Sequence, residues 1–259
     1  MLSIDRKIDI PPGKFAYFAS DFHFGIQGTE DSSTREKEIC NWLDSIKGDA
    51  HALFLMGDIW DAWMEYKLVV PKGNTRFLGK LAELSDQGIQ LFIFSGNHDL
   101  WMRDYFQQEL NAEVIHEHQT FQFNDKIVRL GHGDGIGPGD SFYKVLKVFL
   151  RNPFCQWLYR QIHPDLGLRI ASYFSKRGPK HKYDNIEFLG EEQEYQIQYA
   201  RTLLETQHYD YFIFGHRHIP NVLPMNERCT YINLGDWLSH KTYAQLGEEV
   251  VLNKYGAGL

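Results

Sequence analysis

Short runs of apolar, β-branched and aromatic residues recur along the chain between more polar stretches, a pattern typical of buried strands. Six such runs begin at Phe15, His51, Leu91, Ile127, Tyr209 and Tyr231. Apolar residues with helical spacing lie between several of them. They predict helices over residues 32–48, 74–88 and about 186–206. Candidate caps at Ser32, Ser33 and Asn74, and glycines at Gly48 and Gly88, bound the first two helices.

Strands alternate with helices in the first half of the chain. Denser strand signals follow, such as Phe121 and Phe123 before a turn at Asn124 and Asp125. This order predicts an α/β sandwich of mixed sheets. The chain has 259 residues, of which 43% are hydrophobic, so it can bury a substantial core. We expect a single domain over residues 1–259.

Residues 136–182 differ from their surroundings in pattern and in charge. Phe142, Val145 and Phe149 share one helical face. Pro153 ends that pattern, and two further helical stretches follow. The segment holds nine basic residues and two acidic ones, whereas the whole chain has a net charge of −7. We expect a small inserted helical cap, which either packs on the main domain or faces an anionic lipid surface.

The start of the chain alternates charged and apolar residues and then meets two prolines, so it lacks the apolar centre of a signal peptide. No apolar run approaches the roughly 18–20 residues of a membrane-spanning helix. The three cysteines show no paired spacing. These features predict a cytoplasmic protein with reduced thiols. The net negative charge argues against nucleic acid as a partner.

Polar side chains follow five of the runs, at the point where each predicted strand ends. They are DFH at 21–23, GDIWD at 57–61, GNHD at 96–99, GHGD at 131–134 and GHRH at 215–218. Strand ends are where α/β sheets usually place their sites. Asp21 and His23 are two residues apart, as are His216 and His218, so each pair would point to one side of an extended segment. The glycines allow sharp turns or close backbone approach.

These segments supply a set of candidate metal ligands: Asp21, His23, Asp58, Asn97, His132, His216 and His218. Imidazole, carboxylate and amide groups suit Mn, Fe or Zn better than Ca, and the lack of cysteine ligands argues against a structural zinc. Seven ligands are too many for one tetrahedral ion and suit two ions that share a carboxylate. We expect in-line attack on phosphorus by a metal-bound hydroxide, with both ions clamping the phosphoryl oxygens.

His98 is the candidate for protonating or steadying the leaving oxygen. Asp61 is its expected carboxylate partner and would fix the orientation and tautomer of the ring. Asp99 and Asp134 are expected to cap turns or orient neighbours, and Asp236 to be a turn residue. The remaining histidines are expected to be solvated or hydrogen-bonded outside the site: His51, His116, His118, His163, His181, His208 and His240.

The five blocks, in this order, resemble the calcineurin-like metallophosphoesterase superfamily from Asp21 to His218. The superfamily pattern is DxH, GDxxD, GNH followed by D or E, a histidine block and GHxH. The resemblance implies an αββα sandwich. It also implies a first ion and a second ion that share one ligand. The first would take Asp21, His23, Asp58 and His218, and the second Asp58, Asn97, His132 and His216.

A narrower resemblance is to the UDP-2,3-diacylglucosamine pyrophosphatases of lipid A synthesis. It rests on residues 58–63, on GHGD at 131–134 followed by Asp140 and Tyr143, and on the basic helical insertion. It implies attack on the α-phosphorus, release of UMP and a 2,3-diacylglucosamine 1-phosphate, manganese as the metal, and an insertion that holds the acyl chains. The expected substrate contacts are Asn97, Asp140, Tyr143, Lys144 and Arg151. That family commonly has Arg where this chain has His98.

The leading interpretation is a manganese-dependent pyrophosphatase that acts on a lipid-linked nucleotide and is cytoplasmic and peripheral to the inner membrane. The alternative is a metallophosphoesterase of the same superfamily acting on another phosphodiester, a nucleotide or a phosphomonoester. A protein serine/threonine phosphatase fits less well, because Ala62 and Trp63 follow Asp61 where that branch has Arg and Gly. A nucleic-acid enzyme fits less well, because the basic residues cluster in an apolar cap. A noncatalytic scaffold usually loses ligands, and none is missing here.

Overall fold

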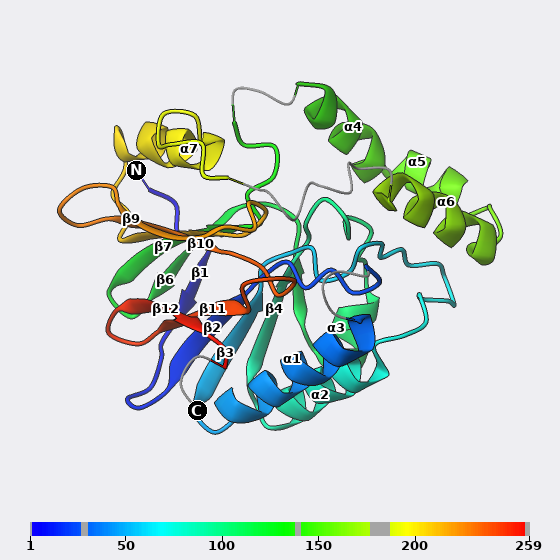
Figure 1. Ribbon diagram of the computed structural model, residues 1–259, viewed down its shortest axis with the longest axis horizontal. Coiled ribbons are helices and arrows are strands. Elements are labelled where there is room, and N and C mark those ends of the chain that lie inside the picture. Colours follow the sequence, from blue (N-terminus) through cyan, green and yellow to red (C-terminus); the bar gives the residue numbers. More distant parts are fainter. Residues whose placement is uncertain (1, 27–30, 138–140, 177–186, 257–259) are drawn as a thin grey trace.

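The computed structural model describes residues 2–26, 31–137, 141–176 and 187–256, and its main body is two six-stranded sheets packed face to face (Figure 1). One sheet has the order β12 (Val250–Lys254), β11 (Thr242–Leu246), β2 (Phe15–Ala19), β3 (Ala50–Leu55), β4 (Gln90–Phe94), β5 (Glu113–Ile115). The other has the order β1 (Arg6–Ile8), β6 (Gln119–Phe123), β7 (Lys126–Gly131), β8 (Tyr211–Phe214), β10 (Thr230–Leu234), β9 (Pro220–Pro224). Both sheets combine parallel and antiparallel pairs. The predicted sandwich of mixed sheets is confirmed.

Strand β2 shows why these apolar runs form buried strands. Its side chains alternate, so that Ala16 and Phe18 join the core between the sheets while Tyr17 and Ala19 join the core under the helices. The Phe18 ring stacks on Phe54 of β3, with ring centroids 4.8 Å apart. Because both faces of the strand are covered, its sequence is apolar throughout and shows no polar alternation.

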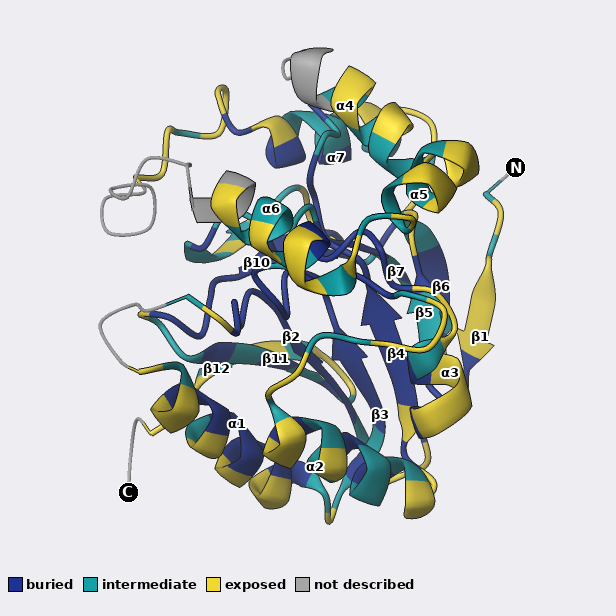
Figure 2. Cartoon of the chain, turned by 90° about the vertical axis from the view of Figure 1, so that its right-hand side faces the viewer, coloured by how far each residue is buried: buried dark blue, intermediate teal, exposed yellow. Residues whose placement is uncertain are grey.

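Helices cover the outer faces of both sheets, which completes four αββα layers (Figure 1). On one side lie α1 (Ser32–Ile46), α2 (Thr75–Asp86) and α3 (Tyr105–Leu110), and on the other lies α7 (Tyr195–Leu204). Trp42 of α1 and Phe77 of α2 are fully buried. Figure 2 shows that α1 and α2 have buried residues on the side that faces the sheet and exposed residues on the outer side.

Three helices gather at one end of the molecule: α4 (Ser141–Arg151), α5 (Pro153–Tyr159) and α6 (Pro164–Lys176) (Figure 1). The predicted break at Pro153 is confirmed, because the Asn152 side chain accepts hydrogen bonds from the first backbone N–H groups of α5. The Trp101 indole donates to the carbonyl of Leu150 at 2.7 Å and so ties α4 to the main body. The cap boundaries 136–182 remain a prediction, since residues 138–140 and 177–186 lie outside the described part.

The six predicted strands all exist, and each begins within two residues of its expected start. The helix expected from about residue 186 begins only at Tyr195, so its predicted start was wrong. Gly190 has a φ of +91°, which interrupts a right-handed helix, and a turn at 191–193 follows it. The short strands β1, β5 and β9, the hairpin of β11 and β12, and helix α3 were not predicted.

Candidate metal centre

The loops that follow β2, β3, β4, β7 and β8 meet at one edge of the sandwich and bring all the candidate ligands close together. Ligand atoms of Asp21, His23 and His218 lie within 4.8 Å of one another, and so do those of Asp58, His132 and His216. Five of these six residues are buried and His216 is half-buried. The arrangement therefore places the expected ligands in two adjoining groups, and a third group of His23, Asp61 and His98 shares His23 with the first.

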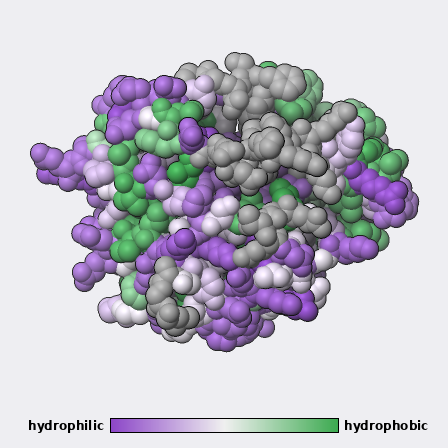
Figure 3. Space-filling model, in the orientation of Figure 1, coloured by the Kyte–Doolittle hydropathy of each residue, from purple (hydrophilic) through white to green (hydrophobic). Residues whose placement is uncertain are grey.

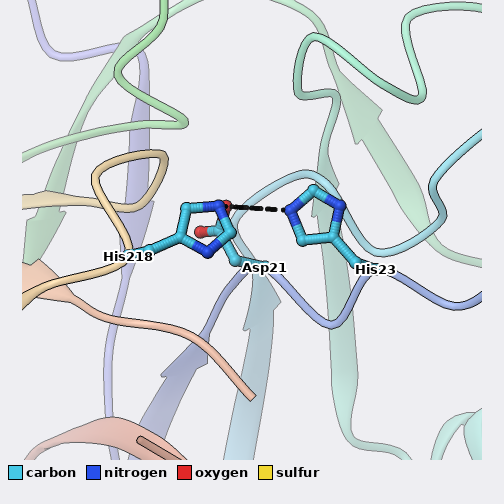
Figure 4. A group of neighbouring side chains, drawn as sticks. All are labelled: Asp21, His23 and His218. Carbon is cyan, nitrogen blue, oxygen red and sulfur yellow. Dashed lines mark hydrogen bonds and ion pairs between the residues drawn. The ribbon is translucent and has the colours of Figure 1, made fainter. Parts of the chain in front are cut away.

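In the first group the Asp21 carboxylate lies beside the His218 ring, and His23 faces both residues (Figure 4). The Oδ1 atom of Asp21 is 3.1 Å from Nε2 of His218 and 3.6 Å from Nε2 of His23. The two Nε2 atoms are themselves 3.3 Å apart. Without a metal ion, a proton on one ring would let it donate to the other, and a cation between the two nitrogens would satisfy both lone pairs in place of that proton.

The second group is centred on Asp58. Its Oδ2 atom lies 3.3 Å from Nε2 of His132, and that nitrogen is 3.3 Å from Oδ1 of Asn97. The His216 ring lies against the His132 ring, with centroids 5.1 Å apart. Asp58 Oδ2 also lies 3.8 Å from Nε2 of His23 in the first group. The Asp58 carboxylate thus stands between the two groups.

The backbone of the ligands is bent in an uncommon way. Positive φ angles occur at Asp21 (57°), His23 (45°), Asp58 (51°), His216 (68°) and His218 (55°). The expectation that each Asp or His pair projects from an extended segment was therefore wrong. The paired side chains converge because the chain turns in the left-handed region. Such conformations are unfavourable for residues other than glycine and concentrate at functional sites.

The motif glycines allow the loops to approach closely, as expected. A Cβ atom on Gly57 would lie 2.6 Å from Nδ1 of His132. A Cβ on Gly96 would overlap Asp58, and one on Gly215 would overlap Ser20. The side chains of the cluster can therefore converge only where these positions carry no side chain.

Hydrogen bonds on the far side of two rings aim them at the cluster. His132 Nδ1 lies 2.9 Å from the carbonyl oxygen of Met56, and His218 Nδ1 lies 3.1 Å from Oδ2 of Asp236. Both contacts leave Nε2 to face the carboxylates. The interpretation of Asp236 as a turn residue was incomplete: it accepts the expected turn hydrogen bonds from Ser239 and His240, but it also orients His218.

The cluster concentrates negative charge that requires a positive partner. Burial alone would raise the pKa of the Asp21 carboxyl, but His218 and His23 hold it well below its usual range. Burial alone would lower the pKa of His132, yet Asp58 raises it to about 10, and Asp21 likewise raises the pKa of His218 to about 9. A divalent cation would supply the same charge and displace those protons. The donor set therefore fits divalent metal ions.

His98 lies at the edge of the first group. Its Nδ1 is 3.2 Å from Oδ1 of Asp61 and 3.1 Å from the Asp61 carbonyl oxygen, and its ring centroid is 5.0 Å from that of His23. Its backbone N–H donates to Oδ1 of Asp58 at 2.9 Å. His98 and Asp61 are thus in contact beside the candidate ligands, while their catalytic role stays a prediction.

Two buried polar residues hold the ligand loops together. Asp99 accepts hydrogen bonds from the N–H groups of Gly96 (2.7 Å) and Ile59 (2.8 Å), which joins the loops after β3 and β4 as expected of an orienting residue. Gln196, on α7, donates to the carbonyl oxygens of Gly133 (3.2 Å) and Gly215 (3.0 Å), beside two of the ligands. Nothing in the sequence marks a buried glutamine on a helix, so Gln196 was missed.

The expected substrate contacts have different surroundings. Asn97 lines a cavity of about 540 Å³ that opens from the ligand cluster. Lys144 donates to the carbonyl of Gly137, and Arg151 is held by Glu117 and the carbonyl of His116, so both tie α4 to the main body. Asp140 lies outside the described residues. Tyr143 belongs to α4, but its side chain is not described.

Comparison with known proteins finds similar curated hydrolases. A UDP-2,3-diacylglucosamine hydrolase from Porphyromonas gingivalis is 37% identical over 242 residues, which cover 88% of this chain and 92% of that protein. One from Haemophilus influenzae is 26% identical over 240 residues, covering 90% and 94%. Among solved structures, the Escherichia coli phosphoesterase Yfce matches with a TM-score of 0.43 at 15% identity, covering 90% of this chain and 88% of that one.

A comparison with family profiles found no match. Within the described residues, no helix combines the length and the apolar character that crossing a bilayer requires.

The enzyme class follows from the curated relatives and from the ligand groups at the strand ends. With 37% identity over 88% of its length, the chain belongs to the UDP-2,3-diacylglucosamine hydrolase family, and it is a hydrolase.

Proposed function

We propose that the protein hydrolyses the pyrophosphate of UDP-2,3-diacylglucosamine to UMP and 2,3-diacylglucosamine 1-phosphate. The reaction would use two divalent metal ions, and manganese is the first candidate. The observation that supports this most is the pair of ligand groups joined by Asp58, in a chain 37% identical to a UDP-2,3-diacylglucosamine hydrolase. Hydrolysis of a phosphoric anhydride suits such a paired site.

The two groups divide the ligands between two ions. Asp21, His23, Asp58 and His218 would hold the first, and Asp58, Asn97, His132 and His216 the second. When bound, the ions supply Lewis acidity that activates water and neutralises charge developing on the phosphoryl oxygens. Nitrogen and oxygen donors without thiolates suit manganese. Cys40 and Cys229 are buried in the hydrophobic cores, away from the ligands.

His98 supplies the proton in this proposal. Burial alone would lower its pKa, but in the metal-free protein the carboxylates of Asp58 and Asp61 raise it to about 9. The Asp61 carboxylate would continue to favour the protonated ring once the ions are bound to Asp58. Nδ1–H faces Asp61 at 3.2 Å, which leaves the proton on Nε2 for the leaving oxygen. Asp61 keeps the ring in this orientation.

The inserted cap binds the lipid part and rests on the membrane surface. Phe149 (60% exposed) and Phe154 (66% exposed) leave large apolar surface uncovered, and Trp157 lies beside Phe154 in a stacked pair. Figure 3 shows apolar and hydrophilic residues side by side over these helices at the right-hand edge. Such a surface fits acyl chains and an anionic headgroup layer.

The test is release of UMP from UDP-2,3-diacylglucosamine by purified protein, first stripped with a chelator and then given Mn²⁺, Zn²⁺ or Ca²⁺. We expect turnover with Mn²⁺, none after chelation, and loss of activity in Asp58→Asn. Asp125→Asn, in an exposed turn, is the matched control and should keep full activity. Cleavage of bis(p-nitrophenyl) phosphate without any UMP release would contradict this proposal and support the alternative, a metallophosphoesterase that acts on another phosphodiester. The presence of His98, where the family commonly has Arg, is the observation that favours this alternative.

A further inference from the structure

The cavity beside the ligand cluster extends toward helix α7. Its lining includes Asp58, Asn97 and His216 at one end and Gln193, Tyr195 and Gln198 at the other. Its volume of about 540 Å³ lies in the range of small-molecule sites. Residues of this cavity therefore reach from the reacting centre to the N-terminal turn of α7.

The described residues of α4, α5 and α6 do not line this cavity. Two chemically different surfaces thus flank the ligand cluster: the apolar helices of the cap and the more polar cavity under α7. In an in-line displacement on the α-phosphorus the leaving oxygen is apical, whereas the ester oxygen of the nucleoside arm is equatorial, so the two arms leave the phosphorus in different directions. A substrate with two unlike arms would therefore place one arm on each surface.

The α7 side has groups that suit a flat heterocycle. Tyr195 is 46% exposed, and it packs so closely on Gly137 that a Cβ at Gly137 would overlap it. The ring is thereby held in place while it lines the cavity. Gln198 lies one helical turn further along α7. One N–H of its carboxamide donates to the Glu192 carbonyl at 2.6 Å, and the second N–H and the oxygen can donate to and accept from the edge of uracil.

We propose that this cavity is the nucleoside subsite, in which the base of the substrate stacks on Tyr195 and its edge meets the carboxamides of Gln193 and Gln198. The inference rests on the proposed function, because that function supplies the nucleotide arm. It leaves the cap helices to the acylated sugar. Stacking of a base on one aromatic ring contributes enough to change affinity about tenfold or more.

The probes are UMP and ribose 5-phosphate, which lacks the base, each titrated into manganese-loaded protein by calorimetry. We expect UMP to bind about tenfold more tightly than ribose 5-phosphate in the wild-type protein and in Tyr195→Phe. Tyr195→Ala and Tyr195→Leu should lose that preference and keep the affinity for ribose 5-phosphate. Tyr195→Leu preserves apolar contact with Gly137, so it separates loss of the ring from loss of packing.

Tyr173→Ala, a change of an exposed tyrosine on α6, is the matched control and should leave the preference for UMP intact. A preference for UMP that survives in Tyr195→Ala would overturn the subsite, as would its loss in Tyr173→Ala. Failure of the proposed function has a different signature: Tyr195-dependent UMP binding would remain, while UDP-2,3-diacylglucosamine would not be hydrolysed.

Discussion

The Nδ1 atom of His218 lies 3.1 Å from the Oδ2 atom of Asp236, on the side of the ring away from the ligand cluster. Asp236 is only 1% exposed, and although burial alone would raise its pKa, His218 and His240 hold it below the usual range. A carboxylate in this position keeps the Nδ1 proton on the ring and so leaves Nε2 free to bind a cation.

Asp236→Asn should weaken metal binding by about 10- to 100-fold, because the amide keeps the size of the side chain but removes the negative charge that favours the Nδ1–H tautomer. The asparagine oxygen can still accept from the N–H groups of Ser239 and His240, so the fold should persist. Competition against a metal-binding dye measures the affinity, and thermal unfolding of the metal-free protein reports the fold.

His240→Gln is the matched control for Asp236→Asn. His240 contacts the other carboxylate oxygen of Asp236 at 3.3 Å and is itself 43% exposed at the side chain. Its replacement should leave metal affinity unchanged. Equal affinity in wild-type protein and Asp236→Asn would show that Asp236 serves only the turn.

Gly96→Ala should abolish metal binding, because the added methyl group would overlap the backbone and carboxylate of Asp58, the residue between the two ligand groups. Gly79→Ala is the control. Gly79 lies within α2 with open space around its Cβ position, so alanine there should raise stability by up to about 1 kcal/mol. Metal titration together with chemical unfolding separates the two effects. Wild-type metal affinity in Gly96→Ala would contradict the tight approach of the loops.

Gln196→Met should lower the free energy of unfolding by about 1–3 kcal/mol, since it leaves buried hydrogen-bonding groups such as the Gly133 carbonyl without the amide donor. Metal affinity should fall as well, because Gly133 and Gly215 adjoin ligands on two different loops. Thr202→Ala, on the exposed side of the same helix, should change stability by no more than about 0.5 kcal/mol. Loss of stability with unchanged metal affinity would limit Gln196 to a structural role.

The chemistry of the site was accessible from the sequence, because each motif follows a strongly apolar run and strand ends converge at one sheet edge. Its geometry was not. The left-handed backbone at Asp21 and His23 depends on contacts with the neighbouring loop, such as the hydrogen bond from the N–H of His23 to the carbonyl of Asp58. Asp236 was treated as a turn residue because only the folded chain brings it to His218.

Elements with weak local signals were also missed. Strand β11 (TYAQL) alternates buried and partly buried residues, and no residue of β12 (VVLNK) is fully buried. The pairing of β11 with β2, and of β12 with β11, is set by tertiary contacts rather than by a strong apolar run. The helix expected from about residue 186 begins late for a related reason: the apolar spacing continues toward its N-terminus, but Gly190 adopts a backbone conformation that no helix contains. Periodicity alone cannot distinguish these cases.

The three cysteines should differ sharply in reactivity. Cys40 and Cys229 are buried, and burial raises their thiol pKa to about 11 and about 12. At pH 8 a thiol with a pKa of about 11 is ionised to roughly one part in a thousand, and only the thiolate reacts rapidly with alkylating agents. Cys155, on α5 of the cap, is partly exposed. The native protein should therefore acquire one adduct at Cys155 with iodoacetamide, and the denatured protein three.

Mass spectrometry of the intact protein and of its peptides counts and places these adducts. Cys155→Ser should show no adduct in the native state and two after denaturation. The denatured sample is the control, because it shows that Cys40 and Cys229 can be labelled once they are exposed. Raising the pH should accelerate labelling of Cys40 before Cys229, because the lower of the two pKa values yields more thiolate at a given pH. Rapid native labelling of either buried cysteine at pH 8 would mean that its core opens far more often than the packing around Trp42 and Tyr231 implies.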